Sequence, residues 1–149
     1  MTTDIIVGFP GETDADFDAT LAVVEAADFD AAYTFVYSPR PGTPAAAARD
    51  EFIPHDVAQE RMRRLTAVVE RHALVRHQAR IGRVEEILID GPSKREPHRV
   101  SGRTRQGKLV HVAAGPRLDV GQLARVRITD AAPHWLAGER VQTIPVAAA

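Results

Sequence analysis

A strand–helix–strand pattern at the start of the chain most restricts the folds open to it. Asp4–Phe9 is a short apolar run rich in β-branched residues, which is typical of a strand covered on both faces. Residues 10–12 mark a turn, and Thr13 followed by Asp16 predicts a capping box at the start of a helix. Residues 32–37 form the next apolar run. This order predicts a βαβ unit with parallel strands.

A long helical segment follows a proline-rich stretch. Residues 38–54 are predicted to be a loop because prolines punctuate them. In residues 55–79 apolar side chains recur at helical spacing, and the predicted apolar stripe consists of Ala58, Met62, Leu65, Val69 and Ala73. Arginines, Arg61 among them, are expected to line much of the remaining helix surface. The segment is predicted to be a spacer between two units.

The last part of the chain has an all-β pattern. Short runs separated by glycine and proline predict strands at residues 84–90, 99–105, 108–112, 123–129 and 139–142. Turns are expected between them, one of them at Gly91-Pro92-Ser93, and a frayed tail at 145–149. Five short strands over about sixty residues suit a small closed or partly closed barrel. The predicted fold class is therefore α/β followed by all-β.

Charge changes sign along the chain. Residues 1–79 hold 7 basic and 13 acidic side chains, a net charge of −6, whereas residues 80–149 hold 12 and 7, a net charge of +5. The split favours two units, the second attracted to polyanions. The alternative is chance variation between solvated surfaces.

Composition excludes several kinds of site. The chain has no cysteine, so it offers no disulfide, no thiolate nucleophile and no sulfur ligand for zinc or an iron–sulfur cluster. Its six histidines show no metal-ligand spacing, and no metal site is predicted. No apolar run is long enough to span a membrane, and the first residues do not have the pattern of a signal peptide.

Basic residues are concentrated in the predicted barrel. Lys94 to Lys108 contains six basic side chains and one acidic one, Glu96, and Arg125 and Arg127 alternate with apolar residues. A basic barrel face is the electrostatic footprint of a nucleic-acid-binding protein. Trp135 is the only aromatic residue of this part, so phosphate and sugar contacts are expected rather than base stacking. The alternative is a well-solvated barrel surface.

Three segments together resemble a known family. DIIVGFPGET, FVYSPRPGTPA and GRVEEILIDGPSKREPHRVSGRTRQGKLVHV resemble the C-terminal part of the radical-SAM methylthiotransferases, from about Thr3 to Val141. The branch they resemble most is the MiaB type, which adds a methylthio group to C2 of N6-isopentenyl adenosine-37 of tRNA. Arg40-Pro41 stands where the ribosomal-protein-modifying branch has acidic residues, which favours a tRNA substrate. The related threonylcarbamoyl-adenosine branch remains open.

The resemblance implies a domain organisation and cofactors. Residues 1–54 would be the C-terminal part of a radical-SAM partial barrel, 55–79 a linking helix, 80–143 a TRAM domain that holds tRNA, and 144–149 a tail. The family enzyme uses SAM and two [4Fe–4S] clusters. All cluster cysteines would lie upstream of this chain, so the isolated chain is expected to be inactive.

The resemblance also implies a cofactor site at the ends of the first two strands. Strand alternation puts Asp4, Ile6 and Gly8 on one face, where Ile6 would pack on the adenine of SAM and Gly8 would allow close approach. At the end of the next strand, Ser38 would hydrogen-bond the cofactor and Arg40 would meet a carboxylate or an RNA phosphate. The implied cofactor-binding residues are Asp4, Ile6, Gly8, Tyr37, Ser38 and Arg40. A buried strand with a tight turn, and a rigid proline loop with an exposed arginine, are the structural alternatives.

The expected partner is tRNA, bound by the barrel. The candidate RNA-binding residues are Lys94, Arg95, Arg99, Arg103, Arg105, Lys108, Arg125 and Arg127. We expect a monomeric cytoplasmic protein that binds neither DNA nor a membrane. Two other functions remain open: a stand-alone, non-catalytic RNA-binding module, or an inactive truncated product.

Overall fold

The computed structural model describes residues 1–93, 96, 98–115 and 118–144 of the 149-residue chain. The chain divides into two compact units, Met1–Ala73 and Leu74–Ala149. The division lies inside the helix that the sequence predicts as a spacer. The domain limits drawn from the resemblance, at 54/55 and 79/80, stay predictions. Among the described residues, no helix is both long and apolar enough to cross a membrane.

The first unit opens with a βαβ arrangement. Strands β1 (Thr2–Val7) and β2 (Ala31–Val36) are parallel, with Ile6 opposite Phe35, and helix α1 (Asp14–Ala27) connects them. The Thr13 hydroxyl accepts a hydrogen bond from the Asp16 amide at 3.2 Å, and the Asp16 carboxylate accepts one from the Thr13 amide at 2.9 Å. The predicted parallel pairing and capping box are both confirmed.

The segment after β2 contains more structure than predicted. Helix α2 (Pro44–Ala47) and the 3₁₀ helix η1 (Arg49–Glu51) lie within the stretch that the sequence predicts as loop. Thr43 caps α2 by accepting a hydrogen bond from the Ala46 amide at 3.3 Å. Pro44 stands in the first turn, where its missing N–H costs nothing, so it begins a helix rather than excluding one.

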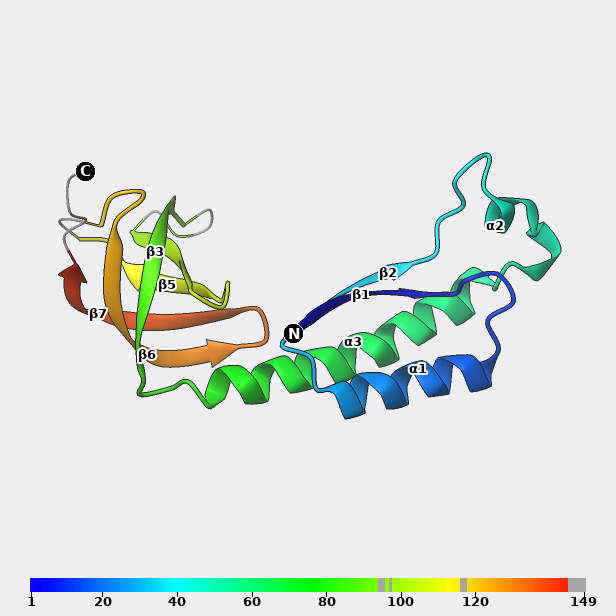
Figure 1. Cartoon of the computed structure of the whole chain (residues 1–149), viewed down its shortest axis with the longest axis horizontal. Coiled ribbons are helices and arrows are strands. Elements are labelled where there is room, and N and C mark those ends of the chain that lie inside the picture. The colour runs from blue at the N-terminus through cyan, green and yellow to red at the C-terminus, as the bar shows by residue number, and fades with distance from the viewer. Residues whose placement is uncertain (94–95, 97, 116–117, 145–149) are drawn as a thin grey trace. The chain divides into compact units, whose positions relative to one another are not determined.

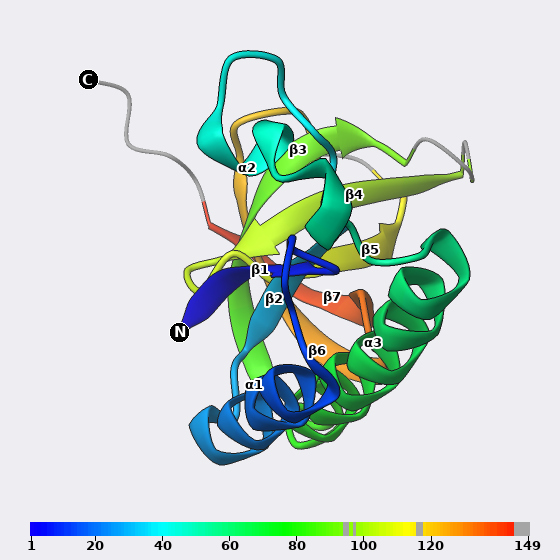
Figure 2. The same ribbon diagram turned by 90° about the vertical axis from the view of Figure 1, so that its right-hand side faces the viewer.

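Two helices cover one face of the small sheet. Figures 1 and 2 show α1 running beside α3 (His55–Gln78), both on the same side of β1 and β2. The buried core between these layers consists of Val7, Phe17, Val24 and Leu65, with Met62 and Val69 packed against it. Ala58 and Ala73 are also buried, which confirms the predicted stripe of α3. The opposite face of the sheet is open: Ile6 is 52% exposed and Phe35 is 51% exposed.

The second unit is a closed five-stranded barrel, as predicted. Its strands are β3 (Val84–Pro92), β4 (Arg99–Thr104), β5 (Leu109–Ala113), β6 (Leu123–Ala132) and β7 (Trp135–Ile144). They follow the order β3-β4-β5-β7-β6, and β3 closes the ring by pairing with β6. All neighbours are antiparallel except β5 and β7.

Two strand limits differ from the prediction. Gly91 and Pro92, predicted as part of a turn, belong to β3, which continues past a bulge between Ile89 and Gly91. Strand β7 begins at Trp135 rather than at Glu139, because it pairs with both β5 and β6. The predicted frayed tail, 145–149, lies outside the described residues.

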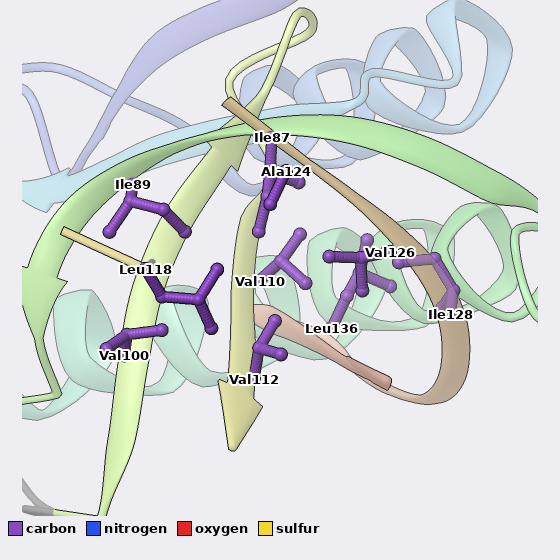
Figure 3. Close-up of a cluster of buried hydrophobic side chains, with 10 residues drawn as sticks. All are labelled: Ile87, Ile89, Val100, Val110, Val112, Leu118, Ala124, Val126, Ile128 and Leu136. Carbon is purple, nitrogen blue, oxygen red and sulfur yellow. The ribbon is translucent and has the colours of Figure 1, made fainter. Parts of the chain in front are cut away.

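The barrel has its own core, drawn in Figure 3. Side chains from every strand point inward, and the cluster comprises Ile87, Ile89, Val100, Val110, Val112, Leu118, Ala124, Val126, Ile128 and Leu136. Two glycines let strands approach closely. A Cβ on Gly102 would lie 2.6 Å from the Leu88 carbonyl oxygen, and one on Gly138 would lie 2.7 Å from that of Arg127. Larger residues there would push β3 and β6 away from their neighbours.

Candidate functional site

The outer surface of β6, β3 and β4 carries most of the described candidate RNA-binding residues. In the register Arg125 of β6 lies opposite Glu86 of β3, and Leu88 of β3 lies opposite Arg103 of β4. Ala124, Val126 and Ile128 are buried while Arg125 and Arg127 are exposed, so the predicted alternation along β6 is confirmed. We call this surface the arginine face and define it by Arg103, Arg105, Arg125 and Arg127.

Carboxylates of β3 pair with two of these arginines. Arg103 Nε lies 3.3 Å from Asp90 Oδ2, and Arg105 Nη2 lies 3.2 Å from Glu86 Oε1. The arginine side chains are 57% and 82% exposed. Exposed ion pairs of this kind contribute only about 0–1 kcal/mol. A phosphate can therefore compete for the same guanidinium groups.

The other arginines have different surroundings. Arg127 Nη1 donates to the Gly82 carbonyl oxygen at 3.0 Å, and Arg99 Nε lies 2.9 Å from Glu96 Oε2. Arg125 is exposed and makes no ion pair within the part of the chain that the structure describes. Arg125 and Arg127 are thus the two arginines of this face whose charges are not paired with a carboxylate among the described residues.

Lys108 does not join the arginine face. It is only 8% exposed, in contrast to the exposed position that the RNA-binding prediction requires. Its amide donates to the Thr104 hydroxyl at 3.2 Å where the chain turns from β4 into β5. Two further candidates, Lys94 and Arg95, lie outside the described residues.

The carboxyl ends of β1 and β2 form a second candidate site, which we call the strand-end site. The Tyr37 amide donates to the Val7 carbonyl oxygen at 2.8 Å, so the two strand ends are adjacent. Asp4 and Ile6 are exposed on the open face of the sheet, and Ser38 and Arg40 are exposed beyond the end of β2. The structure therefore brings the candidate cofactor-binding residues to one edge and one face.

Among these residues, Tyr37 has a buried hydroxyl that lacks a hydrogen-bond partner among the described residues. Its ring makes edge-on contacts with Phe9, at 5.1 Å between ring centroids, and with Phe52, at 5.9 Å. Next to it, residues 39–52 line an open depression of about 870 Å³, walled by Pro39, Pro41, Gly42, Thr43, Pro44, Ala46, Ala47, Arg49 and Phe52.

Gly8 has a packing role that the sequence does not predict. It is buried with φ +72°, and a Cβ there would lie 2.9 Å from the Ala58 Cβ of α3. The close approach of α3 therefore requires glycine at this position, and the predicted approach of a ligand to Gly8 stays a prediction. The Gly8 amide donates to Glu12 Oε2 at 3.0 Å, which fixes the turn that follows β1.

A buried arginine supports this turn. Arg61 is 5% exposed, although the sequence places it among surface arginines. Its Nη1 donates to Glu12 Oε1 and its Nη2 to Asp14 Oδ1, both at 2.7 Å. Burial alone would lower the pKa of Arg61, but the Asp14 hydrogen bond and the Glu12 charge outweigh it and raise the pKa. Arg61 stays charged and links α3 to the strand-end site.

A histidine links α1 and α3 further along. His72 Nδ1 lies 2.8 Å from Asp28 Oδ1, and Nε2 lies 2.7 Å from Glu25 Oε2. The hydrogen bond to Asp28, followed by that to Glu25, raises the pKa of His72. Among the described residues no cluster of three potential metal ligands is found.

The burial of Arg61 and of Lys108, which the sequence analysis places on the surface, could have been predicted from the spacing of apolar residues around them. Arg61 follows Ala58 by three residues and precedes Leu65 by four, so it lies on the apolar stripe of α3. Lys108 is in phase with Val110 and Val112, which point into the barrel. The partners of His72 have no such signal, because they are 44 and 47 residues away.

We compared the chain with known protein families and with curated proteins. Residues 78–141, which include most of the barrel, match the TRAM domain family. The chain is also 46% identical over 145 residues to proteins of Burkholderia mallei, Burkholderia pseudomallei and Burkholderia thailandensis. Each is named tRNA-2-methylthio-N(6)-dimethylallyladenosine synthase. The match covers 95% of this chain and 31% of each relative, so the chain spans about a third of their length. The second unit therefore matches the TRAM domain family over residues 78–141, and the chain as a whole is similar to the C-terminal part of these synthases.

Proposed function

We propose that this chain acts as the C-terminal portion of a tRNA methylthiotransferase that modifies C2 of N6-isopentenyl adenosine-37. The observation that carries the proposal is 46% identity over 95% of the chain, because this match extends across both units. It includes the strand-end site as well as the TRAM domain. A match confined to residues 78–141 would support RNA binding alone.

In this proposal the barrel holds the tRNA. The arginine face offers guanidinium groups that donate to phosphate oxygens, and Arg125 does so without first giving up an ion pair among the described residues. Contacts of this type position RNA by its backbone and shape. A tRNA substrate also favours a cytoplasmic location.

The first unit would supply part of a radical-SAM barrel. Its open sheet face offers apolar surface at Ile6 and Phe35 and a carboxylate at Asp4, and the orphaned Tyr37 hydroxyl adds a polar group at the same edge. Such a surface fits the mixed apolar and charged character of SAM, which when bound supplies the methyl group and the radical precursor. Asp4, Ile6, Tyr37, Ser38 and Arg40 would hold it. We leave Gly8 out of this set because α3 covers it.

The iron–sulfur clusters do not fit the residues of this chain. Clusters are held by cysteine thiolates, and the chain has no cysteine. We therefore assign no cluster ligand here and no complete reaction to the chain acting by itself.

The function is tested by nucleoside analysis of tRNA from cells in which the coding sequence is deleted. We expect 2-methylthio-N6-isopentenyladenosine to disappear and its unmethylthiolated precursor to accumulate. Loss of the methylthio derivative of threonylcarbamoyl adenosine instead would assign the chain to that branch. Unchanged levels of both products would contradict the proposal.

A stand-alone RNA-binding module is the second candidate, favoured by the separate core of the closed barrel. An immunoblot of cell extract with a reagent against residues 80–149 separates the two. A species about three times heavier than 16.2 kDa supports the methylthiotransferase, given the 31% coverage of its relatives. A species at 16.2 kDa supports the module or an inactive product, which tRNA binding then distinguishes.

A further inference from the structure

A second surface of the barrel brings together aromatic residues that are distant in the sequence. Trp135 begins β7 and His111 lies in the middle of β5, and the parallel pairing of these strands places His111 opposite Ala137. The two rings are 6.1 Å apart between centroids at an interplanar angle of 64°. Sequence alone predicts no stacking platform because it shows one isolated aromatic residue.

Both rings point away from the barrel core. Their strand neighbours Val110, Val112 and Leu136 are buried, whereas Trp135 and His111 are partly exposed. The indole N–H of Trp135 has no hydrogen-bond partner within the described part of the chain. An amphipathic ring that is neither in the core nor satisfied by a polar partner is suited to binding.

The histidine ring has a defined orientation. Ser101 of β4 lies directly opposite His111, and its Oγ is 3.2 Å from Nδ1. The direction of this hydrogen bond depends on the tautomer of the ring, and Nε2 makes no hydrogen bond to a described residue. Nε2 is then available for a hydrogen bond with a base edge or a sugar hydroxyl.

Charged residues on either side of Trp135 and His111 would orient a bound nucleotide. Strand β4 carries Arg99 and Arg103 on either side of Ser101, on the outer side of the strand. On the opposite flank Asp130 of β6 is paired in register with Ala137. A phosphate is attracted toward β4 and repelled by Asp130, which leaves its base over β5 and β7, about 10 Å away at two strand spacings.

We propose that Trp135 and His111, with Ser101, form a base-stacking subsite for a single-stranded segment of RNA. This inference rests on the proposed RNA-binding function of the barrel and adds a second kind of contact to it. The arginine face binds phosphates, and the new subsite holds an unstacked base. Stacking accepts any base, since every base has a π-face.

The test uses the full 149-residue chain, in which Trp135 is the only tryptophan. Tryptophan emission is followed while a short oligoadenylate is added, and then an oligomer of equal length built from abasic spacers. We expect the oligoadenylate to quench the emission. The abasic oligomer, which carries the same phosphates, should leave the emission unchanged when bound.

Variants separate stacking from charge. Trp135→Leu should weaken oligoadenylate binding at least about fivefold without changing its salt dependence, and Trp135→Phe should retain most of the affinity. Arg125→Ala should instead lower the slope of log K against log salt by about 0.7 and leave the quenching at saturation intact. If Trp135→Leu does not fold, the base-stacking subsite is tested by two other measurements: the quenching of the unmodified chain and the oligoadenylate affinity of Trp135→Phe.

Oligoadenylate binding without quenching, or with unchanged affinity in Trp135→Leu, would overturn the subsite while leaving the proposed function in place. If the chain bound neither tRNA nor either of the two oligomers, both the base-stacking subsite and the proposed function would be overturned.

Discussion

Arg61 on α3 donates a hydrogen bond to Glu12 across 2.7 Å, and both side chains are almost entirely buried. The same glutamate accepts a hydrogen bond from the Gly8 amide with its other oxygen. One carboxylate thus joins the end of β1 to a helix that begins more than forty residues later. The turn that follows β1 is therefore stabilised by the contact between Glu12 and Arg61 of α3, and not only by hydrogen bonds within the turn.

Removing the arginine should destabilise the first unit. Arg61→Met leaves Glu12 charged and buried without its partner, for which we expect a loss of about 3 kcal/mol or more. Urea unfolding followed by the helical circular dichroism signal measures it. Arg63→Ala, on an exposed pair with Glu60, is the matched control and should cost under about 0.5 kcal/mol. Equal losses in the two variants would contradict the role given to Arg61.

Gly8→Ala should cost more than another substitution at positive φ. Gly42 also has positive φ, +85°, but has nothing within 4 Å of an added Cβ, whereas Gly8 faces Ala58. Both variants adopt a strained backbone, and Gly8→Ala adds overpacking worth about 1–3 kcal/mol. The difference between their unfolding free energies isolates the contact. The double variant Gly8→Ala/Ala58→Gly should recover part of the loss, and no recovery would argue against a steric cause.

The His72 contacts should make the stability of the first unit depend on pH. The pKa of His72 is raised in the folded protein by Asp28 and Glu25, so its stabilising effect is present below its ordinary value of about 6.5. The effect is lost as pH rises through the folded pKa. Thermal melts of the chain and of His72→Gln should therefore differ more at about pH 5.5 than at about pH 8.5.

Substitutions on the arginine face should change tRNA affinity in both directions. Arg103→Glu and Arg105→Glu should weaken binding and flatten its salt dependence, with each lost phosphate contact lowering the slope by about 0.9 on duplex RNA if it behaves like B-DNA. Asp90→Asn should strengthen binding, because Arg103 then loses its competing carboxylate. Filter binding over a range of salt concentrations measures all three. Weaker binding by Asp90→Asn would show that the ion pair orients Arg103 instead of competing for it.

Local sequence patterns predict the helices and strands of this chain. They do not predict the contacts between elements that lie far apart in the sequence. Capping at Thr13 and the stripe of α3 depend on neighbours within a few residues, and both were predicted correctly. Strand alternation likewise identified the inward face of β6. The β5–β7 pairing joins segments more than twenty residues apart and has no local signal, so the Trp135–His111 pair was not foreseen. Arg61 was placed on the surface because a charge was assumed to be solvated, whereas Glu12 and Asp14 compensate its burial.

In the proposed binding of RNA, the carboxylates of β3 would also make the barrel select between ligands with one phosphate and ligands with several. Asp90 and Glu86 occupy guanidinium groups that a free mononucleotide could reach only one at a time. A single phosphate gains little by replacing one such pair, whereas a polymer engages several arginines in one binding event and adds the gains together. We therefore expect Arg103 and Arg105 to contribute little to the binding of free nucleotides and more to the binding of ligands whose phosphates are spaced along a chain.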